Sequence, residues 1–205
     1  MPYTIHNVEQ KSVEWLALKR GKISGSRLHD LLVKRGNGVK MEYYRLLAER
    51  LGLPDEDDLA SDMERGERLE FEARELAGKE IGLDFKMVGF ITRDDNANIG
   101  VSPDGLTEDH KHALEIKCFS SARHLQVWKE GVPDEVREQV IQYFIVMDDL
   151  ETVDIVFHDP RVIAKPLIIH RISRAEVEEE IKSIREQEDM WLARLEADTE
   201  ELLGI

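Results

Sequence analysis

Residues 98–118 read N-I-G-V-S-P-D-G-L-T-E-D-H-K-H-A-L-E-I-K-C, and this stretch decides the fold. Its pattern predicts a strand, a tight turn, a polar loop and a second strand over 113–118. Side chains alternate along a strand, so Glu115 and Lys117 share one face, and a hairpin brings Asp104 beside them. Two carboxylates and an ammonium at the end of a sheet predict a site for a divalent metal ion.

The same residues also admit a purely structural interpretation. Pro-Asp-Gly is a common turn signal, in which Asp104 caps its own backbone. A Glu-x-Lys pair on the solvent face of a strand is an ordinary charged surface. The rest of the chain therefore has to decide between the two interpretations.

The 205 residues predict a single domain with a core of helices and a sheet. No apolar run is long enough to span a bilayer, and the N-terminus lacks a signal-peptide pattern. Cys118, the lone cysteine, forms no intrachain disulfide and no cysteine metal cluster. We expect a cytoplasmic protein.

The formal net charge of -15 argues against simple nucleic-acid binding, because such proteins are usually basic. The charge is unevenly distributed, however, with basic residues gathered between positions 19 and 40. The acidic residues concentrate over 55–58, 62–80 and 176–201. A basic patch inside an acidic shell is compatible with an enzyme that holds metal ions.

Hydrophobic periodicity and capping signals give the order of the elements. The predicted helices cover residues 12–21, 24–32, 41–51, 61–78, 120–130, 134–147 and 173–203, and the predicted strands cover 85–92, 99–101, 113–118, 152–158 and 165–172. Capping boxes at Ser61-x-x-Glu64 and Ser173-x-x-Glu176 open two of the helices. This order predicts an α/β or α+β fold with a small mixed sheet flanked by helices.

The helix predicted over 24–32 begins at Ser24 or Ser26, close to the basic residues Lys19, Arg20 and Lys22. Free N–H groups at a helix N-terminus, hydroxyls and positive charge together favour a bound phosphate. The alternative is that the serines only cap the helix and the basic side chains are solvated.

Two helices carry further candidates. Glu67, Glu70 and Arg74 recur at steps of three and four residues, so they share one face of the helix over 61–78. Gln139 and Gln142 lie one turn apart on a largely apolar helix. A buried glutamine must find hydrogen-bond partners, so each is either a structural link or an active-site group.

Four blocks of this sequence match a known family in its own order. They are W-x3-K-R-G-x-I-S-x-S from residue 15, G-E-x2-E-x2-A-R from residue 66, S-P-D-G with L-E-I-K from residues 102 and 114, and Q-V-x-Q-Y followed by D-P from residues 139 and 159. The chain thus resembles the phage lambda-type (YqaJ-like) recombination exonucleases of the PD-(D/E)xK nuclease superfamily. The nuclease core motif alone is loose, whereas all four blocks in this order are specific.

The resemblance implies a PD-(D/E)xK nuclease core and a set of site residues. Mg²⁺ or Mn²⁺ would be held by Asp104, Glu115, the backbone carbonyl of Ile116 and Glu70, and Lys117 would polarise the attacking water. Hydrolysis of a phosphodiester needs an activated water and stabilised negative charge, and divalent cations on oxygen ligands supply both.

The resemblance also implies that Gln142 orients the nucleophile or the phosphate. The residues implied to hold the 5′-terminal phosphate of DNA are Lys19, Arg20, Ser24, Ser26 and Ser102. The family's usual arginine lies where this chain has Lys19, with Arg20 next, so which of the two contacts phosphate is left open. A lysine would offer a point charge instead of a bidentate fork.

The activity implied is a 5′-to-3′ exonuclease that digests one strand of linear double-stranded DNA and releases 5′ mononucleotides. The remaining 3′ overhang would serve a single-strand annealing protein in phage-type recombination. The family's active form is a ring-shaped homotrimer, and no membrane is involved.

Other functions compete with this interpretation. A restriction- or repair-type endonuclease would share the metal centre but would not hold a terminal phosphate. A non-catalytic DNA-binding module is the second alternative, and the intact set of Asp104, Glu115 and Lys117 argues against it. His110 and His112 could begin a zinc site, but the sequence has no third ligand at a suitable spacing.

Overall fold

The fold is described from a computed structural model. It describes residues 12–14, 17, 44–45, 48, 51–53, 59–93, 95 and 99–203. Contacts divide the chain into two compact units. The first unit comprises residues 1–66, 118–131 and 159–166, and the second comprises residues 67–117, 132–158 and 167–205. Four of the predicted phosphate-binding residues, Lys19, Arg20, Ser24 and Ser26, lie outside the described residues.

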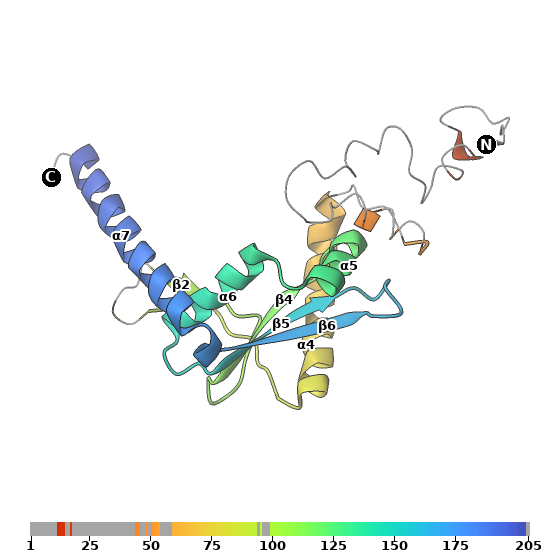
Figure 1. The fold of residues 1–205 in the computed structure, drawn as a ribbon, viewed down its shortest axis with the longest axis horizontal. Helices are drawn as coiled ribbons and strands as arrows, with labels where there is room; N and C mark the ends of the chain where they lie inside the picture. The colour runs from red at the N-terminus through yellow and green to blue at the C-terminus, as the bar shows by residue number, and fades with distance from the viewer. Residues whose placement is uncertain are drawn as a thin grey trace. The chain divides into compact units, whose positions relative to one another are not determined.

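From residue 59 on, the helices and strands follow the predicted order, with β3 in addition (Figure 1). Of the helices predicted over 12–21, 24–32 and 41–51, most residues lie outside the described ones. The helices are α4 (Leu59–Ile81), α5 (Ser121–Glu130), α6 (Asp134–Val146) and α7 (Glu178–Leu203), with a short 3-10 helix, η1 (Arg174–Glu176), before α7. The strands are β1 (Ile91–Thr92), β2 (Gly100–Val101), β3 (Gly105–Leu106), β4 (His112–Lys117), β5 (Thr152–His158) and β6 (Leu167–Ser173).

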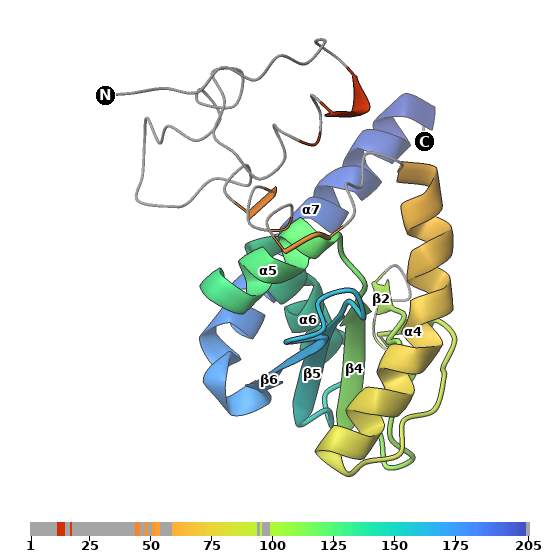
Figure 2. The ribbon, with the colours of Figure 1, turned by 90° about the vertical axis from the view of Figure 1, so that its right-hand side faces the viewer.

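The main sheet belongs to the second unit and has the strand order β3-β4-β5-β6. Strands β4 and β5 are parallel, with Glu115 opposite Ile155, and the other two pairs are antiparallel. The part of α4 from residue 67 lies over one face of the sheet, and α6 lies over the opposite face, where it packs on α7 (Figures 1 and 2). The predicted small mixed sheet flanked by helices is confirmed.

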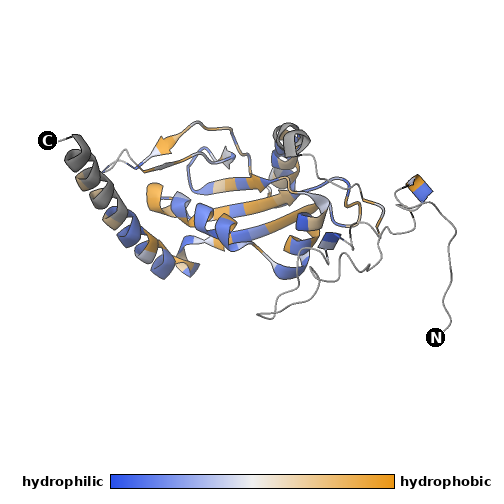
Figure 3. Ribbon diagram, turned by 90° about the horizontal axis from the view of Figure 1, so that it is seen from above, coloured by the Kyte–Doolittle hydropathy of each residue, from blue (hydrophilic) through white to orange (hydrophobic). Residues whose placement is uncertain are grey.

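Strand β5 lies in the interior of this sheet. After Thr152 all of its residues are buried, and most are β-branched or aromatic, as expected of a strand covered on both faces. Figure 3 shows hydrophilic and hydrophobic residues following one another along the helices, as expected of helices with one buried face. The buried carboxylate of Asp154 is neutralised by Arg171, whose Nη2 lies 2.8 Å away.

Helix α4 extends beyond both predicted ends. It begins at Leu59, so Ser61 lies inside the helix and the capping box predicted there is wrong. It also continues past Gly78, where a Cβ would lie 2.9 Å from the carbonyl oxygen of Leu83. The helix ends before Gly82, which has a φ of +78° and so takes the left-handed conformation that closes many helices.

The hairpin within residues 98–118 differs from the predicted one in its first strand. Strand β2 pairs with β1 in a separate two-stranded sheet, and β3 is the partner of β4, with Gly105 opposite Leu114. Of the strand predicted over 85–92, only the last two residues form β1. A Cβ at Gly105 would lie 3.0 Å from the Cβ of Phe85, so the close approach of the chain favours glycine next to Asp104.

The capping box predicted at Ser173 is confirmed, and so is the helix predicted from residue 120. Ser120 caps α5 and accepts a hydrogen bond from the Arg123 backbone. The backbone N–H of Ser173 donates to Glu176 Oε2 at 2.9 Å, and this box opens η1, directly before α7.

Hydrogen bonds of Arg174 link η1 to the end of α6 and to the loop that follows it. Its Nη2 donates to the carbonyl oxygens of Phe144 and Met147 at 2.7 and 2.6 Å, and its Nε donates to that of Leu150 at 2.8 Å. The last carbonyls of a helix lack partners within the helix, so this arginine fixes the end of α6.

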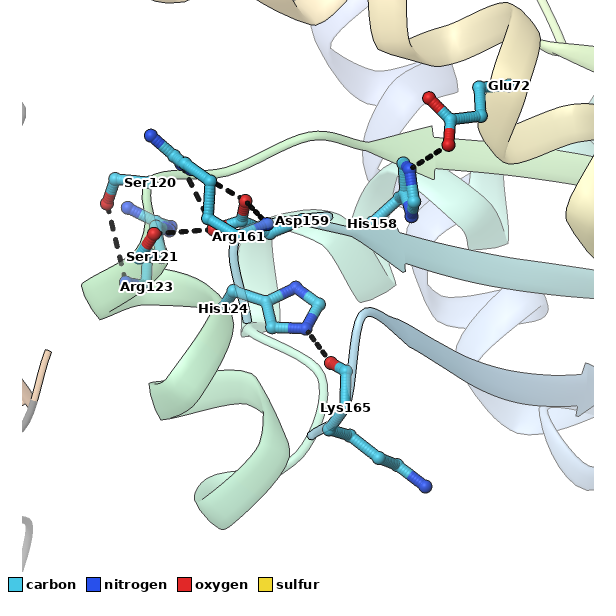
Figure 4. A network of polar contacts seen from close by, with 9 residues as sticks. All are labelled: Glu72, Ser120, Ser121, Arg123, His124, His158, Asp159, Arg161 and Lys165. Atoms are coloured by element: carbon cyan, nitrogen blue, oxygen red, sulfur yellow. Dashed lines mark hydrogen bonds and ion pairs between the residues drawn. The ribbon is translucent and has the colours of Figure 1, made fainter. Parts of the chain in front are cut away.

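The first unit has a small apolar core and a buried polar cluster around α5. The core is formed by Tyr44, Ala48, Leu53, Leu125 and Val162. In the polar cluster, the fully buried Asp159 accepts hydrogen bonds from Ser121 and Arg161 (Figure 4). Within the described part of the chain, no helix is long and apolar enough to cross a membrane.

Figure 4 also shows a separate pair within the second unit. Glu72, on α4, lies 3.7 Å from the buried His158 at the end of β5. This contact links α4 to the sheet.

Candidate active site

Glu115 and Lys117 lie together, as the alternation of β4 predicts. The Lys117 ammonium is 2.6 Å from Glu115 Oε1, and the Glu115 side chain is only 2% exposed. An ordinary solvent-facing charged pair is therefore excluded for Glu115. A buried carboxylate needs a compensating charge and hydrogen-bond donors, and Lys117 supplies the charge.

Asp104 lies beside this pair at the entrance to β3. Its Oδ2 accepts a hydrogen bond of 2.6 Å from the Ile116 backbone, and its own N–H donates to the Leu114 carbonyl at 3.0 Å. Burial, followed by the negative charge of Glu115, raises the pKa of Asp104 to about 7. The hydrogen bond from Ile116 lowers this pKa, but burial and the neighbouring charge prevail.

Tyr143 reaches the site from α6 and contacts the Glu115 oxygen that Lys117 leaves free. Its hydroxyl donates to Glu115 Oε2 and also lies 3.1 Å from the Ser102 carbonyl oxygen. Burial and the charge of Glu115 raise the pKa of Tyr143, so the phenol keeps its proton and remains a donor. Each Glu115 oxygen thus has its own donor.

The inner side of α4 contributes Glu70 and Arg74. Arg74 is 7% exposed, and its Nη2 donates to Glu70 Oε1 at 3.2 Å. Its Nε donates to the backbone carbonyl oxygen of Asp104 at 2.6 Å. The charge of Glu70 contributes to the raised pKa of Asp104, which places a third carboxylate within electrostatic range.

Three further residues singled out from the sequence are described by the structure, and their roles are not decided by it. Gln142 is half-buried on α6, next to Tyr143, and its catalytic role stays a prediction. Gln139 is exposed, contrary to the expectation of a buried residue, and its hydrogen bond with Tyr143 offsets only a small part of the rise in the pKa of that tyrosine. The Ser102 hydroxyl donates to the Gly89 carbonyl at 3.3 Å, and its contact with phosphate stays a prediction.

The sequence alone did not identify Tyr143 and Arg74 as site residues. Tyr143 directly follows Gln142 in the fourth matched block, and Arg74 lies one helical turn after Glu70 in the second. The hydrogen-bond partner of each is distant in sequence, because Tyr143 contacts Glu115 and Arg74 contacts Asp104. Their position inside the matched blocks was the available signal.

The donors fit a hard divalent cation. Asp104, Glu115 and the Ile116 carbonyl offer oxygen ligands only. Burial and, after it, the charge of Glu115 raise the pKa of Asp104, and a bound cation would offset both effects. In the described ranges no three His, Cys, Asp or Glu side chains are grouped closely enough to hold a metal by themselves. Mg²⁺ suits such a set, because it takes few carboxylates and keeps places for water and phosphate.

A small mixed sheet between helices, with Asp, Glu and Lys gathered on one strand pair, is the architecture of the PD-(D/E)xK nuclease fold. Residues 14–149 match the YqaJ-like viral recombinase domain, and the chain belongs to this family. The resemblance found in the sequence is thereby confirmed. The matched region includes every site residue named above.

Solved structures agree with this assignment. An alkaline exonuclease, LHK-Exo, from Laribacter hongkongensis is 27% identical over 93% of this chain and 100% of that one, with a TM-score of 0.54. LHK-Exo in complex with dAMP gives 28% identity over the same shares and a TM-score of 0.53. No curated protein matches the chain.

Proposed function

We propose that this protein is a divalent-metal-dependent deoxyribonuclease that digests one strand of linear double-stranded DNA from its 5′ end and leaves a 3′ overhang. The observation that carries the proposal is the buried Glu115 beside Asp104, with Lys117 on one carboxylate oxygen and Tyr143 on the other. Membership of a recombinase family supports DNA as the substrate.

Asp104, Glu115 and the carbonyl of Ile116 would hold Mg²⁺ or Mn²⁺, with Glu70 as a further carboxylate. The cation supplies an activated water and stabilises the negative charge that develops on the phosphate. Tyr143 keeps Glu115 in one orientation, because its hydrogen bond fixes Oε2. The hydrogen bond from Ile116 fixes Asp104 in the same way.

Lys117 has two tasks in this proposal. In the structure its ammonium neutralises Glu115 at 2.6 Å. With a cation bound by Glu115, the ammonium would be available to donate to a non-bridging oxygen of the scissile phosphate and to the attacking water. A fixed positive charge of this kind, in a site shielded from bulk water, stabilises the transition state.

The products and the end preference are further parts of the proposal. LHK-Exo, the related alkaline exonuclease, has been solved in complex with dAMP, which supports 5′ mononucleotides as products here. The 5′ phosphate would contact Lys19 or Arg20, Ser24, Ser26 and Ser102. A homotrimeric ring and a single-strand annealing partner complete the proposed recombination system.

Digestion of end-labelled duplex DNA tests the proposal. We expect Mg²⁺-dependent release of 5′ mononucleotides from 5′-phosphorylated linear duplex, little release from 5′-hydroxyl ends and none from closed circles. EDTA and Lys117→Ala should abolish it. Lys111→Ala is the matched control, because Lys111 is an exposed lysine just before β4 that pairs with Glu151 at 2.5 Å.

Two results would contradict the proposal. Equal cutting of closed circles and linear duplex would indicate an endonuclease. Undiminished digestion by Lys117→Ala would remove this site from the reaction.

A further inference from the structure

Arg74 is a buried arginine that contacts two different parts of the candidate site. One edge of its guanidinium donates to Glu70 Oε1 at 3.2 Å and to the Asp104 carbonyl oxygen at 2.6 Å. The first acceptor is on α4, and the second is at the entrance to β3. Arg74 therefore connects the helix to the sheet beside Asp104.

This arrangement differs from an ordinary pair on a helix surface. An exposed ion pair at a four-residue spacing contributes little, because water screens it and both side chains are mobile. Arg74 is 7% exposed, and the backbone of Asp104 is itself fixed by its hydrogen bond to Leu114. The planar guanidinium fork consequently sets the position of Glu70 relative to Asp104.

Glu70 needs such a restraint. Its side chain is 35% exposed, so several rotamers that point to solvent are open to it. The negative charges of Asp104 and Glu70 repel each other, although burial and Glu115 contribute more to the raised pKa of Asp104. Arg74 supplies an attraction that opposes both effects.

We propose that Arg74 is a positioning residue for the cation site, which holds the Glu70 carboxylate toward Asp104 without contacting the cation. The inference rests on the proposed function, since it assigns a ligand role to Glu70. It predicts that Arg74 changes cation affinity through Glu70 alone.

Cation binding in the absence of DNA tests this inference. Titration calorimetry with Mn²⁺ on the full chain should show about 10-fold weaker binding for Arg74→Met, the lower end of the effect of losing a group that orients a ligand. Arg68→Met is the matched control, because Arg68 is an exposed arginine on the same helix, and it should bind as the unmodified protein does.

A double-mutant cycle separates positioning from general destabilisation. Glu70→Gln should weaken Mn²⁺ binding, and Arg74→Met added to it should weaken binding little further, because both changes remove the same interaction. A purely structural role for Arg74 would give losses that add. Arg74→Lys keeps the charge, but its shorter side chain ends in a single ammonium that cannot bridge both acceptors, so it should also bind Mn²⁺ more weakly.

Wild-type Mn²⁺ affinity in Arg74→Met, or additive losses in the cycle, would overturn the inference and leave the proposed function intact. If Arg74→Met does not fold, wild-type affinity in Arg74→Lys would overturn it equally. If the unmodified protein neither binds Mn²⁺ nor digests DNA, the proposed function fails as well.

Discussion

The phenol of Tyr143 gives the sharpest test of how the site is held together. Tyr143→Phe removes one hydroxyl and keeps a ring that is 1% exposed, so packing is preserved. Glu115 then keeps Lys117 on Oε1 but has lost its donor to Oε2. Because the Glu115 side chain is 2% exposed, water cannot readily replace that donor.

The size of the effect follows from the charge on the acceptor. A hydrogen bond to a charged group contributes about 1.5–3 kcal/mol, and a buried acceptor left without a donor costs a similar amount. We therefore expect Tyr143→Phe to lower the free energy of unfolding by about 2 kcal/mol in EDTA at pH 8. We also expect weaker Mn²⁺ binding, because the Glu115 oxygen is no longer fixed.

Urea unfolding followed by circular dichroism measures the first quantity, and calorimetric titration measures the second. Tyr44→Phe is a matched control, since Tyr44 is another buried tyrosine that donates to a glutamate, Glu130, at 2.6 Å. It should leave Mn²⁺ binding unchanged. Stability and Mn²⁺ affinity equal to those of the unmodified protein in Tyr143→Phe would refute the reasoning, because Glu115 would then not depend on the phenol.

Two further predictions concern Asp104 and Arg174. Burial raises the folded pKa of Asp104 to about 7 from 3.8, so its contribution to stability is present below pH 3.8 and is lost as the pH rises through about 7. In EDTA, the melting temperature of Asp104→Asn should therefore be higher than that of the unmodified protein at pH 8 but not near pH 4. An equal difference in melting temperature at both pH values would contradict this. Arg174→Met removes the donors to two carbonyl oxygens at the end of α6 and to that of Leu150 before β5, and should cost at least about 2 kcal/mol of unfolding free energy in urea titrations. A loss below about 0.5 kcal/mol would show that water replaces these donors.

Local patterns predicted the fold class and the centre of the site. The alternation of β4 placed Glu115 next to Lys117, and the short connection placed Asp104 beside them. These contacts join residues that are two and at most thirteen positions apart, so they depend on strand geometry and little else. The capping box at Ser173 was predicted correctly for the same reason.

Contacts between residues that are distant in sequence could not be predicted from the sequence pattern. Tyr143 meets Glu115 across 28 positions, and Arg74 meets Asp104 across 30. The pairing of β2 with β1 also depends on which strand is nearest in space, which alternation does not specify. The start of α4 at Leu59 shows that a serine and glutamate at capping spacing can equally lie inside a helix.

The shared carboxylate of Glu115 has a consequence for assembly of the protein. One Glu115 oxygen contacts the Lys117 ammonium and the other accepts a hydrogen bond from the Tyr143 phenol. Strand β4 itself thus supplies the counter-ion of its buried glutamate. The polypeptide can therefore bury this acid during synthesis without a bound ion. In the proposed function, a cation would then have to compete with the Lys117 amine for the Glu115 carboxylate.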